Sequence, residues 1–237
     1  MSSPQNPASQ NNTASHAGLS AASEMALTSL IQRAPLASSL ATVFKEKGFT
    51  LALVGGPVRD ALLGRLGNDL DFTTNAPANE TKKILQKWAD NVWDTGIEFG
   101  TVAAKRGETT VEITTYRSDK YSTDSRKPDV EFGTSIEGDL SRRDFTVNSM
   151  ALELTGASPV FIDPYGGLID LANKTLRTPG KPEDSFSDDP LRMLRAARFA
   201  SQLNFVISPE VLHAMQEMTD RLEIVSAERV RDEITKL

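Results

Sequence analysis

Two aspartates one residue apart are the residues of this chain best suited to chemistry. Asp69 and Asp71 stand in a strand-like run, and an apolar segment that ends in Gly55-Gly56 precedes them. Because alternate side chains of a strand point to the same face of a sheet, the two carboxylates are expected side by side. Paired carboxylates hold divalent cations, and a glycine turn beside them leaves room for phosphates. This combination predicts metal-dependent phosphoryl or nucleotidyl transfer.

A third acid lies in the alternating run VEITTY, where Glu112 faces away from Val111 and Ile113. Such an acid either faces solvent only or completes a three-carboxylate site for two cations. We favour the second interpretation, because a site of that kind serves the in-line attack of a hydroxyl on a phosphate.

The glycine turn carries a phosphate-binding signal of its own. Gly56 follows a strand, where the lack of a side chain lets the backbone approach a phosphate and leaves amide hydrogens free to bind it. Arg59 supplies a charged fork for the same phosphates. The spacing matches neither a P-loop nor a dinucleotide-binding fingerprint, and a plain tight turn is the alternative.

The run SRRDFTVNSMAL, residues 141–152, holds a second polar group. On a helix, Arg143, Asp144 and Asn148 fall on one face. An arginine and an aspartate beside a metal site suit the phosphate and the ribose hydroxyls of a nucleotide. A surface salt bridge with an asparagine cap is the alternative interpretation.

A third polar group recurs every three residues in the later part of the chain. Pro190 fits the first position of a helix and Asp189 its N-cap. Asp189, Arg192, Arg195 and Arg198 then form a polar ridge along that helix. A carboxylate only accepts hydrogen bonds and a guanidinium only donates them, so together they match the edge of a nucleotide base. The alternative is an amphipathic helix with an arginine-rich solvent face, which the near absence of lysine disfavours.

The composition excludes several other kinds of site. The 237 residues include no cysteine and two histidines, which rules out disulfides, thiolate metal sites and a histidine-rich zinc site. Any metal is therefore held by oxygen, which favours magnesium or manganese. Without cysteine or a membrane-length apolar run, the chain is expected to be cytoplasmic, with no membrane partner. A formal net charge of −6 argues weakly against a protein that coats nucleic acids in general, although the arginines cluster locally.

Strands are expected in the first part of the chain and helices in the last. We expect an α/β fold of the α+β type, with a head domain over residues 25–178 and a helical region over 179–237. Residues 1–24 are expected to be a disordered tail and 118–128 a polar, mobile loop. The last apolar pattern stops without a cap, so we expect the natural chain to continue. The expected elements are a helix over 25–47 broken at Pro35, strands Phe49–Val54 and Leu70–Thr73, a helix Asn79–Trp88, a hairpin of Gly100–Ala104 with Thr109–Tyr116, a short helix and a strand within Ser141–Leu154, a strand Val160–Asp163, and helices Pro190–Leu203, Pro209–Met218 and Ala227–Leu237.

These signatures, in this order, resemble the class II tRNA nucleotidyltransferases, the CCA-adding enzymes of the polymerase-beta-like superfamily. The resemblance covers Leu51 to Leu237 and implies a nucleotidyltransferase head with a mixed, mostly antiparallel sheet, followed by an all-helical neck. It also implies that the RNA-binding body and tail of the family lie beyond Leu237. Seven collinear segments carry the resemblance: GGPVRDALLG, DLD, FGTV, VEITTYR, RRDFTVNSMAL, DPYGG and DDPLRMLRAARF.

The resemblance implies the template-independent addition of C and A nucleotides, from CTP and ATP, to the 3′ end of tRNA. Asp69 and Asp71 would bind two Mg²⁺ ions, for which Mn²⁺ is a substitute, and Glu112 would be the supporting catalytic carboxylate. The loop at 118–128 matches the flexible loop of the family. The other implied contacts are Gly56, Arg59 and Arg143 with the nucleotide, Asp144 with its sugar, Asp189 and Arg192 with its base, and Arg195 and Arg198 with its phosphates or with the helix itself.

Relatives with other activities share these motifs. Bacterial poly(A) polymerases have the same signatures, but their counterpart of GIEFGTV generally carries a basic residue and a nearby histidine, so this stretch favours the tRNA enzyme. A relative that adds only C or only A shares the head motifs and stays an open alternative. A non-catalytic nucleotide-binding or RNA-binding module would have a degraded acid pair, whereas Asp69 and Asp71 are both intact.

Overall fold

The structure is a computed structural model that describes residues 21, 24–30, 32, 35–94, 96–120, 129–132 and 135–237. The tail expected over residues 1–24 lies outside the described residues, except for Ala21 and Glu24. The expected break at Pro35 separates a first helical segment, residues 24–30, from helix α2 (Leu36–Glu46).

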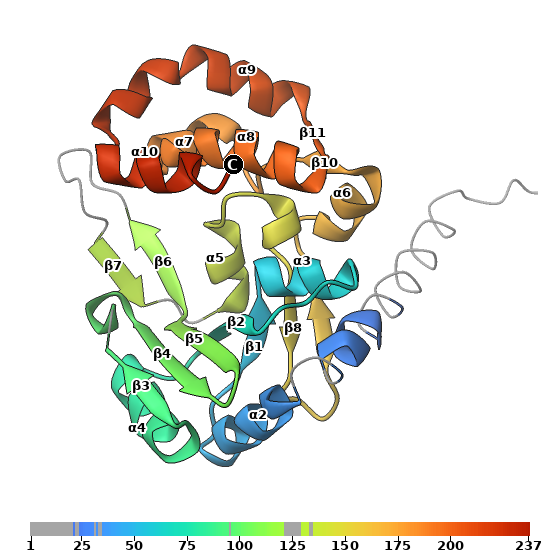
Figure 1. Cartoon of the computed structure of the whole chain (residues 1–237), viewed down its shortest axis with the longest axis vertical. Helices are drawn as coiled ribbons and strands as arrows, with labels where there is room; N and C mark the ends of the chain where they lie inside the picture. The colour runs from blue at the N-terminus through green and yellow to red at the C-terminus, as the bar shows by residue number, and fades with distance from the viewer. Residues whose placement is uncertain are drawn as a thin grey trace, which may run out of the picture.

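One mixed sheet forms the centre of the molecule (Figure 1). Its neighbouring strands are antiparallel except for the parallel pair of β2 with β5. The expected α+β fold with a mixed, mostly antiparallel sheet is therefore confirmed. In spatial order the strands are β3 (Asn91–Trp93), β4 (Thr101–Arg106), β5 (Thr109–Thr115), β2 (Asp69–Thr74), β1 (Ala52–Val54), β8 (Ala151–Glu153) and β9 (Val160–Ile162).

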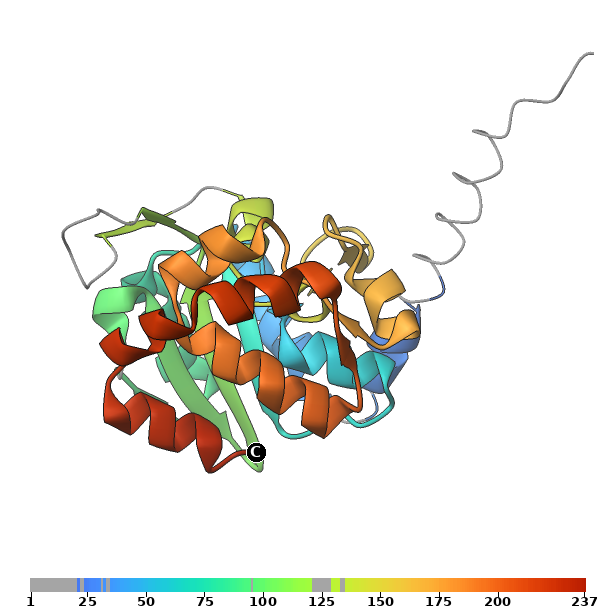
Figure 2. The ribbon, with the colours of Figure 1, turned by 90° about the horizontal axis from the view of Figure 1, so that it is seen from above.

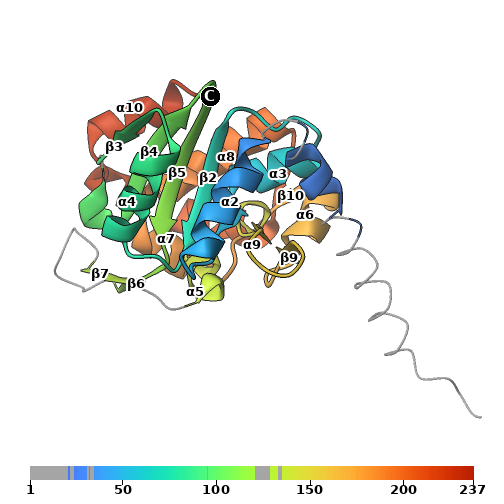
Figure 3. The same ribbon diagram turned by 90° about the horizontal axis from the view of Figure 1, so that it is seen from below.

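The large hydrophobic core covers one face of this sheet. Alternate residues of the central strands, such as Leu70 and Phe72 on β2 and Ile113 on β5, are buried there. Helices α2 and α4 (Ala78–Trp88) cover this face, as Figure 3 shows from below. The period of two in the strands thus directs every other side chain into the core and its neighbours to the opposite face.

The opposite face is covered only in part. Helix α5 (Ile136–Ser141) packs Leu140 against Ala52, Val54 and Ala151 in a second, smaller apolar cluster. Those contacts lie over β1 and β8, so the matching face of β2, β5 and β4, whose side chains are mostly polar, lies outside the α5 cluster.

The C-terminal helices lie on the same side of the sheet as α5 (Figures 1 and 2). Strand β11 also lies in this helical region, and it pairs in parallel with β10. The elements in chain order are α6 (Gly167–Asn173), β10 (Thr175–Leu176), α7 (Pro182–Asp188), α8 (Leu191–Leu203), β11 (Val206–Ile207), α9 (Pro209–Glu217), the 3-10 helix η3 (Thr219–Ile224) and α10 (Ala227–Ile234).

Two expected elements are clearly displaced in the structure. Strand β1 begins at Ala52 rather than Phe49, because the backbone N–H groups of Thr50 and Leu51 donate to side chains, those of Asn75 and Thr155. The expected helix within Ser141–Leu154 lies earlier, as α5, and is followed by a 3-10 helix, η2 (Thr146–Asn148).

The polar loop expected at 118–128 begins with ordered backbone. Residues 118–120 belong to strand β6 (Arg117–Lys120), which pairs with β7 (Asp129–Phe132), and residues 121–128 lie outside the described residues. No helix among the described residues has the length and apolarity needed to cross a membrane.

Candidate active site

Three carboxylates share the face of the sheet that the large core leaves open. Asp69 and Asp71 alternate on β2 with the buried Leu70, and both are exposed. In the parallel pairing of β2 with β5, the direct partner of Asp71 is Glu112, which is exposed as well. The structure therefore brings Asp69, Asp71 and Glu112 together on one face.

The charges of this group act on one another, most clearly at Asp71. Burial among neighbouring atoms, followed by the negative charge of Glu112, raises the pKa of Asp71 from 3.8 to about 6; Asp69 also raises it, and Arg143 lowers it. The residue nevertheless keeps solvent access, so a cation can reach its carboxylate. A divalent ion would relieve the repulsion and favour the ionised carboxylate.

The donor set fits magnesium chemistry with substrate present. Within the described part of the chain, no three or more His, Cys, Asp or Glu side chains are arranged to hold a metal ion by themselves. Mg²⁺ does not require such a cage, since it is commonly held by one or two carboxylates together with waters and substrate phosphates. Asp69 and Asp71 provide such a pair.

A tight glycine turn follows β1. Gly55 has a φ of +71°, a region that favours glycine, and a Cβ added there would lie 2.8 Å from Nη1 of Arg143. Gly56 begins helix α3 (Gly56–Leu62), and a Cβ at Gly56 would lie 3.5 Å from Nη2 of Arg59. Two guanidinium groups therefore stand against this turn, close to where a phosphate would approach it.

The guanidinium of Arg143 is held by α5. Its Nη2 donates to Oδ2 of Asp139 at 3.1 Å, while Nη2 of Arg142 donates to Oδ1 of the same carboxylate at 2.7 Å. Burial disfavours the ionised form of Asp139, but the two guanidiniums hold its pKa below the usual value. The prediction that Arg143 and Asp144 lie on one face of a helix is wrong, because α5 ends at Ser141 and the chain turns before η2.

Asp144 is the centre of a buried network instead. Its Oδ2 accepts hydrogen bonds from Nε and Nη2 of Arg195, at 2.9 and 2.6 Å. Its Oδ1 accepts from the backbone N–H of Phe145 at 2.8 Å and from Nδ2 of Asn148 at 3.0 Å. Burial alone would raise the pKa of Asp144, but Arg195 and these hydrogen bonds lower it. A contact between Asp144 and a nucleotide sugar would therefore have to replace a protein contact.

The network extends to α3 and surrounds one aromatic ring. Nη1 of Arg59 donates to Oδ1 of Asn148 at 2.6 Å. Three guanidinium carbons lie over the ring of Phe199, those of Arg59 and Arg195 at 5.3 Å from its centroid and that of Arg198 at 4.2 Å. The ring of Phe199 thus contacts cationic side chains of both α3 and α8.

A buried acid of the last helix balances part of this charge. Glu233 of α10 is 5% exposed and accepts a hydrogen bond from Nε of Arg198. Nη1 of Arg195 lies 3.9 Å from the same carboxylate. Sequence reasoning missed Glu233, because its partners lie on a distant helix and no local spacing reveals them. It also missed Asp139, although the arginines three and four residues later are a signal for it.

The pair predicted to read a base has protein partners in this conformation. Nη1 of Arg192 donates to Oγ of Ser185 at 2.8 Å, and Nη2 donates to the carbonyl of Arg142 at 2.6 Å. Oδ2 of Asp189 accepts from Nη2 of Arg229 at 2.8 Å, and its other oxygen accepts a backbone N–H at the start of α8. Both side chains are half-buried where α8 begins, but they do not bond to each other.

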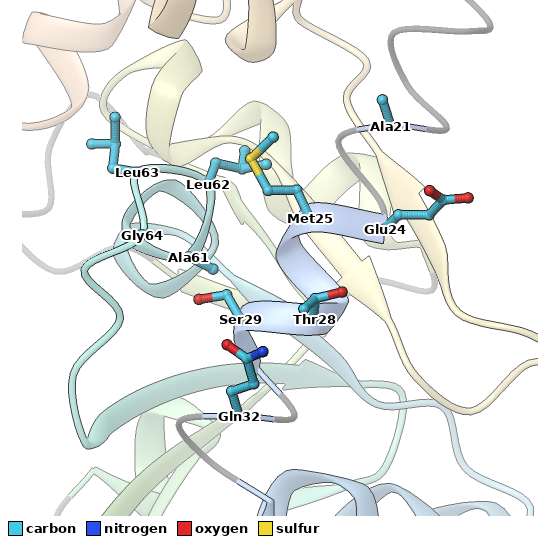
Figure 4. Close-up of a pocket in the computed structure, with 10 residues that line it drawn as sticks. All are labelled: Ala21, Glu24, Met25, Thr28, Ser29, Gln32, Ala61, Leu62, Leu63 and Gly64. Atoms are coloured by element: carbon cyan, nitrogen blue, oxygen red, sulfur yellow. The ribbon is translucent and has the colours of Figure 1, made fainter.

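A pocket elsewhere in the molecule contains none of the predicted site residues. It has a volume of about 650 Å³ and is lined by residues in and next to the first helical segment and by residues at and just after the end of α3. Figure 4 shows this lining, with residues from Ala21 to Gln32 on one side and from Ala61 to Gly64 on the other. The three carboxylates therefore lie on an open face of the sheet, outside this pocket.

Comparison with known proteins agrees with this geometry. Residues 51–177 match the family described as "Poly A polymerase head domain". The chain belongs to this family. Residues 204–237 match a second family, described as "Probable RNA and SrmB- binding site of polymerase A". Membership of the poly(A) polymerase head-domain family implies the use of a divalent metal ion.

The chain is similar to curated relatives and to solved structures over most of its own length. The CCA-adding enzyme of Levilactobacillus brevis is 41% identical over 90% of the chain and 52% of the relative. The crystal structure of the Bacillus stearothermophilus CCA-adding enzyme in complex with CTP has a TM-score of 0.75, with 34% identity over 87% of the chain and 48% of that protein. The Thermotoga maritima CCA-adding enzyme complexed with tRNA has a TM-score of 0.72, with 28% identity over 88% of the chain and 49% of that protein. The chain thus spans about half the length of these relatives.

Proposed function

We propose that this chain supplies the nucleotidyltransferase head and neck for the addition of C and A nucleotides to the 3′ end of tRNA. The 3′ hydroxyl oxygen of the RNA attacks the α-phosphorus of CTP or ATP. A new phosphodiester bond forms, the bond to the β-phosphate oxygen breaks, and pyrophosphate leaves. No template strand takes part, so the protein itself selects the nucleotide.

The carboxylate group carries this proposal. Asp69, Asp71 and Glu112 lie on one open face of β2 and β5, where burial and then the negative charge of Glu112 raise the pKa of Asp71. The glycine turn with its guanidinium groups lies at the end of the neighbouring strand β1. Carboxylates for cations next to guanidiniums for a triphosphate form a combination suited to nucleotidyl transfer.

For the metal, we propose two Mg²⁺ ions, replaceable by Mn²⁺, held by Asp69 and Asp71 with Glu112 in support. When bound, such ions lower the pKa of the attacking hydroxyl and stabilise the charge on the triphosphate. Asp71 keeps the solvent access that metal entry requires. Glu112, directly opposite, contributes negative charge that favours cations at this place.

For the nucleotide, we propose that Gly56, Arg59 and Arg143 bind the triphosphate at the turn. Arg143 is oriented by Asp139, which leaves its charge close to the carboxylates. The remaining proposed contacts are Asp144 with the sugar, Asp189 and Arg192 with the base, and Arg195 and Arg198 with the phosphates or the helix.

The base-reading role requires an exchange of partners. Arg192 would release Ser185 or the Arg142 carbonyl, and Asp189 would release Arg229, in order to bond to the Watson–Crick edge of a base. Such an exchange replaces protein contacts by nucleotide contacts of the same type. It therefore requires little change in the number of satisfied donors and acceptors.

The same proposal includes the domain boundaries, the partners and the cellular location. The head is proposed to cover residues 25–178 and the neck 179–237, with tRNA, CTP and ATP as partners. A cytoplasmic location stays a prediction.

The test is to incubate the protein with Mg²⁺, each nucleoside triphosphate separately, and tRNAs that lack A, CA or CCA. We expect one C on the tRNA lacking CA, two on the tRNA lacking CCA, and A only on the tRNA that already ends in CC. The Asp71→Asn variant serves as the inactive control. Incorporation of neither C nor A by the wild-type protein, while CTP binding is intact, would contradict the proposal.

A poly(A) polymerase is the second candidate function, because the matching family carries that name. It would add many A nucleotides from ATP alone, without regard to the existing 3′ end. The same incubation separates the two activities, as well as an enzyme that adds only C or only A.

A further inference from the structure

One row of side chains crosses the open face of the sheet from the carboxylates to its edge. Asp71 is paired with Glu112, Glu112 with Ala103, and Ala103 with Trp93 on the edge strand β3. Residues paired directly across neighbouring strands point to the same face. Trp93 therefore lies on the carboxylate face, three strand spacings, or about 14 Å, from Asp71.

The burial of the neighbouring residues agrees with this placement. Val92, the residue before Trp93, packs against the large core on the other face. Trp93 itself is 42% exposed, although a side chain of its size is usually well buried. Between Trp93 and Glu112 stands only the methyl group of Ala103, which leaves the side of the indole facing the carboxylates unobstructed by that strand.

A cation accompanies the indole. Lys105 is paired with Asn91 on β3 and with Thr110 on β5, so it belongs to the same face, diagonally next to Trp93. Neither a hydrogen bond nor an ion pair joins the Lys105 side chain to another residue in the described ranges. An exposed aromatic ring beside an unpaired ammonium is a combination by which proteins bind single-stranded nucleic acids: the ring stacks on a base and the charge attracts a phosphate.

The proposed reaction determines which substrate reaches this part of the face. In an in-line displacement the attacking and the leaving oxygens lie on opposite sides of the phosphorus. The triphosphate is assigned to the side of β1, where Gly55, Arg143 and Arg59 stand. The attacking 3′ hydroxyl must then come from the other side of the carboxylates, over β5, β4 and β3.

We propose that Trp93 is a stacking platform for a base near the 3′ end of the acceptor RNA, and that Lys105 contacts the adjoining phosphate. This inference rests on the proposed function for the direction of the RNA. Trp93 is a positioning residue, because it lies too far from the carboxylates to touch the reacting atoms.

The first test uses fluorescence, since the chain contains only two tryptophans. Trp88 is 8% exposed, so in the Trp88→Phe variant the signal reports Trp93. A short single-stranded RNA that ends in CC, added without nucleotide or metal, is expected to quench this variant and to leave the Trp93→Phe variant nearly unchanged. Equal quenching of the two variants would overturn the proposal.

The second test separates positioning from structure. Trp93→Ala is expected to raise the KM for tRNA ending in CC by on the order of tenfold, with little change in the KM for ATP or in kcat at saturating RNA. Trp93→Phe, which keeps an aromatic ring, is expected to recover most of the loss. Ile169→Ala, at a 65% exposed apolar position on α6, is the matched control and is expected to change nothing.

The outcomes distinguish this inference from the proposed function. An unchanged KM for RNA in Trp93→Ala, with transfer intact, would overturn the platform and leave the enzyme assignment in place. A protein that transfers no nucleotide, yet whose Trp93 signal is quenched by RNA, would overturn the enzyme assignment and leave an RNA-binding face.

Discussion

Replacing Asp71 by asparagine is expected to stop transfer and, at the same time, to stabilise the metal-free protein. The amide keeps the shape of the side chain but removes one negative charge from the group with Asp69 and Glu112. Loss of that charge weakens metal binding, so transfer should fall to background. The same loss removes the cost of partly burying a charge and the repulsion by Glu112 and Asp69, which the folded protein has and the unfolded chain lacks.

The size and the sign of the stability effect follow from the pKa. Asp71 titrates near 6 in the folded protein instead of 3.8, so the folded state holds its proton more tightly than the unfolded state. The stability linked to this proton is fully present below pH 3.8 and is lost as the pH rises through about 6. The shift corresponds to about 3 kcal/mol. Because the residue is exposed and solvent screens its charge, we expect about 1 kcal/mol in practice.

The assay is urea unfolding without metal at mildly alkaline and at acidic pH, for wild type, Asp71→Asn and the control Asp220→Asn. Asp220 is an exposed acid of η3, far along the chain from the carboxylates. We expect Asp71→Asn to be more stable than wild type only at the higher pH, and Mg²⁺ to stabilise wild type but not this variant. A variant that is less stable than wild type at alkaline pH, or one that retains turnover, would refute the reasoning.

Three further substitutions test other parts of the site. Gly55→Ala should lower the unfolding free energy by about 1–2 kcal/mol and weaken CTP binding, since its Cβ would press on Arg143. The control is Gly107→Ala, which is also at positive φ but in open space, so it should cost similar stability and leave CTP binding unchanged. Glu233→Gln should lower the unfolding free energy by about 3 kcal/mol, because it leaves the buried Arg198 without its counter-charge; an unchanged urea midpoint would count against that role. Arg192→Ala should reduce the preference for CTP and ATP over UTP and GTP roughly tenfold to a hundredfold, and a preserved preference with a slower rate would make the residue structural.

The sequence predicts the strand-based part of the site well, because a strand has a simple period. Alternation on β2 and β5 is enough to place Asp69, Asp71 and Glu112 on the side opposite the buried residues. What it does not contain is the register between the two strands, which puts Glu112 directly opposite Asp71. That register depends on pairing between distant segments.

The helical part of the site was less predictable, because side-chain partners there come from other elements. Arg143 and Asp144 are neighbours in sequence, yet Arg143 bonds to α5 and Asp144 bonds to Arg195 on α8. The partner of Asp189 is Arg229, on another helix again. Local spacing identifies which charges are present, but only the tertiary packing decides how they are paired.

The parallel pairing of β2 with β5 affects when, during folding, the metal-binding surface forms. Helix α4 and strands β3 and β4 separate these two strands in the chain, so their contact closes a long loop and forms late relative to local hairpins. Until it forms, Glu112 is not opposite Asp71, and a nascent or partly refolded chain lacks the three-carboxylate surface. Metal binding during refolding should therefore appear together with the slowest, global phase rather than with the early collapse.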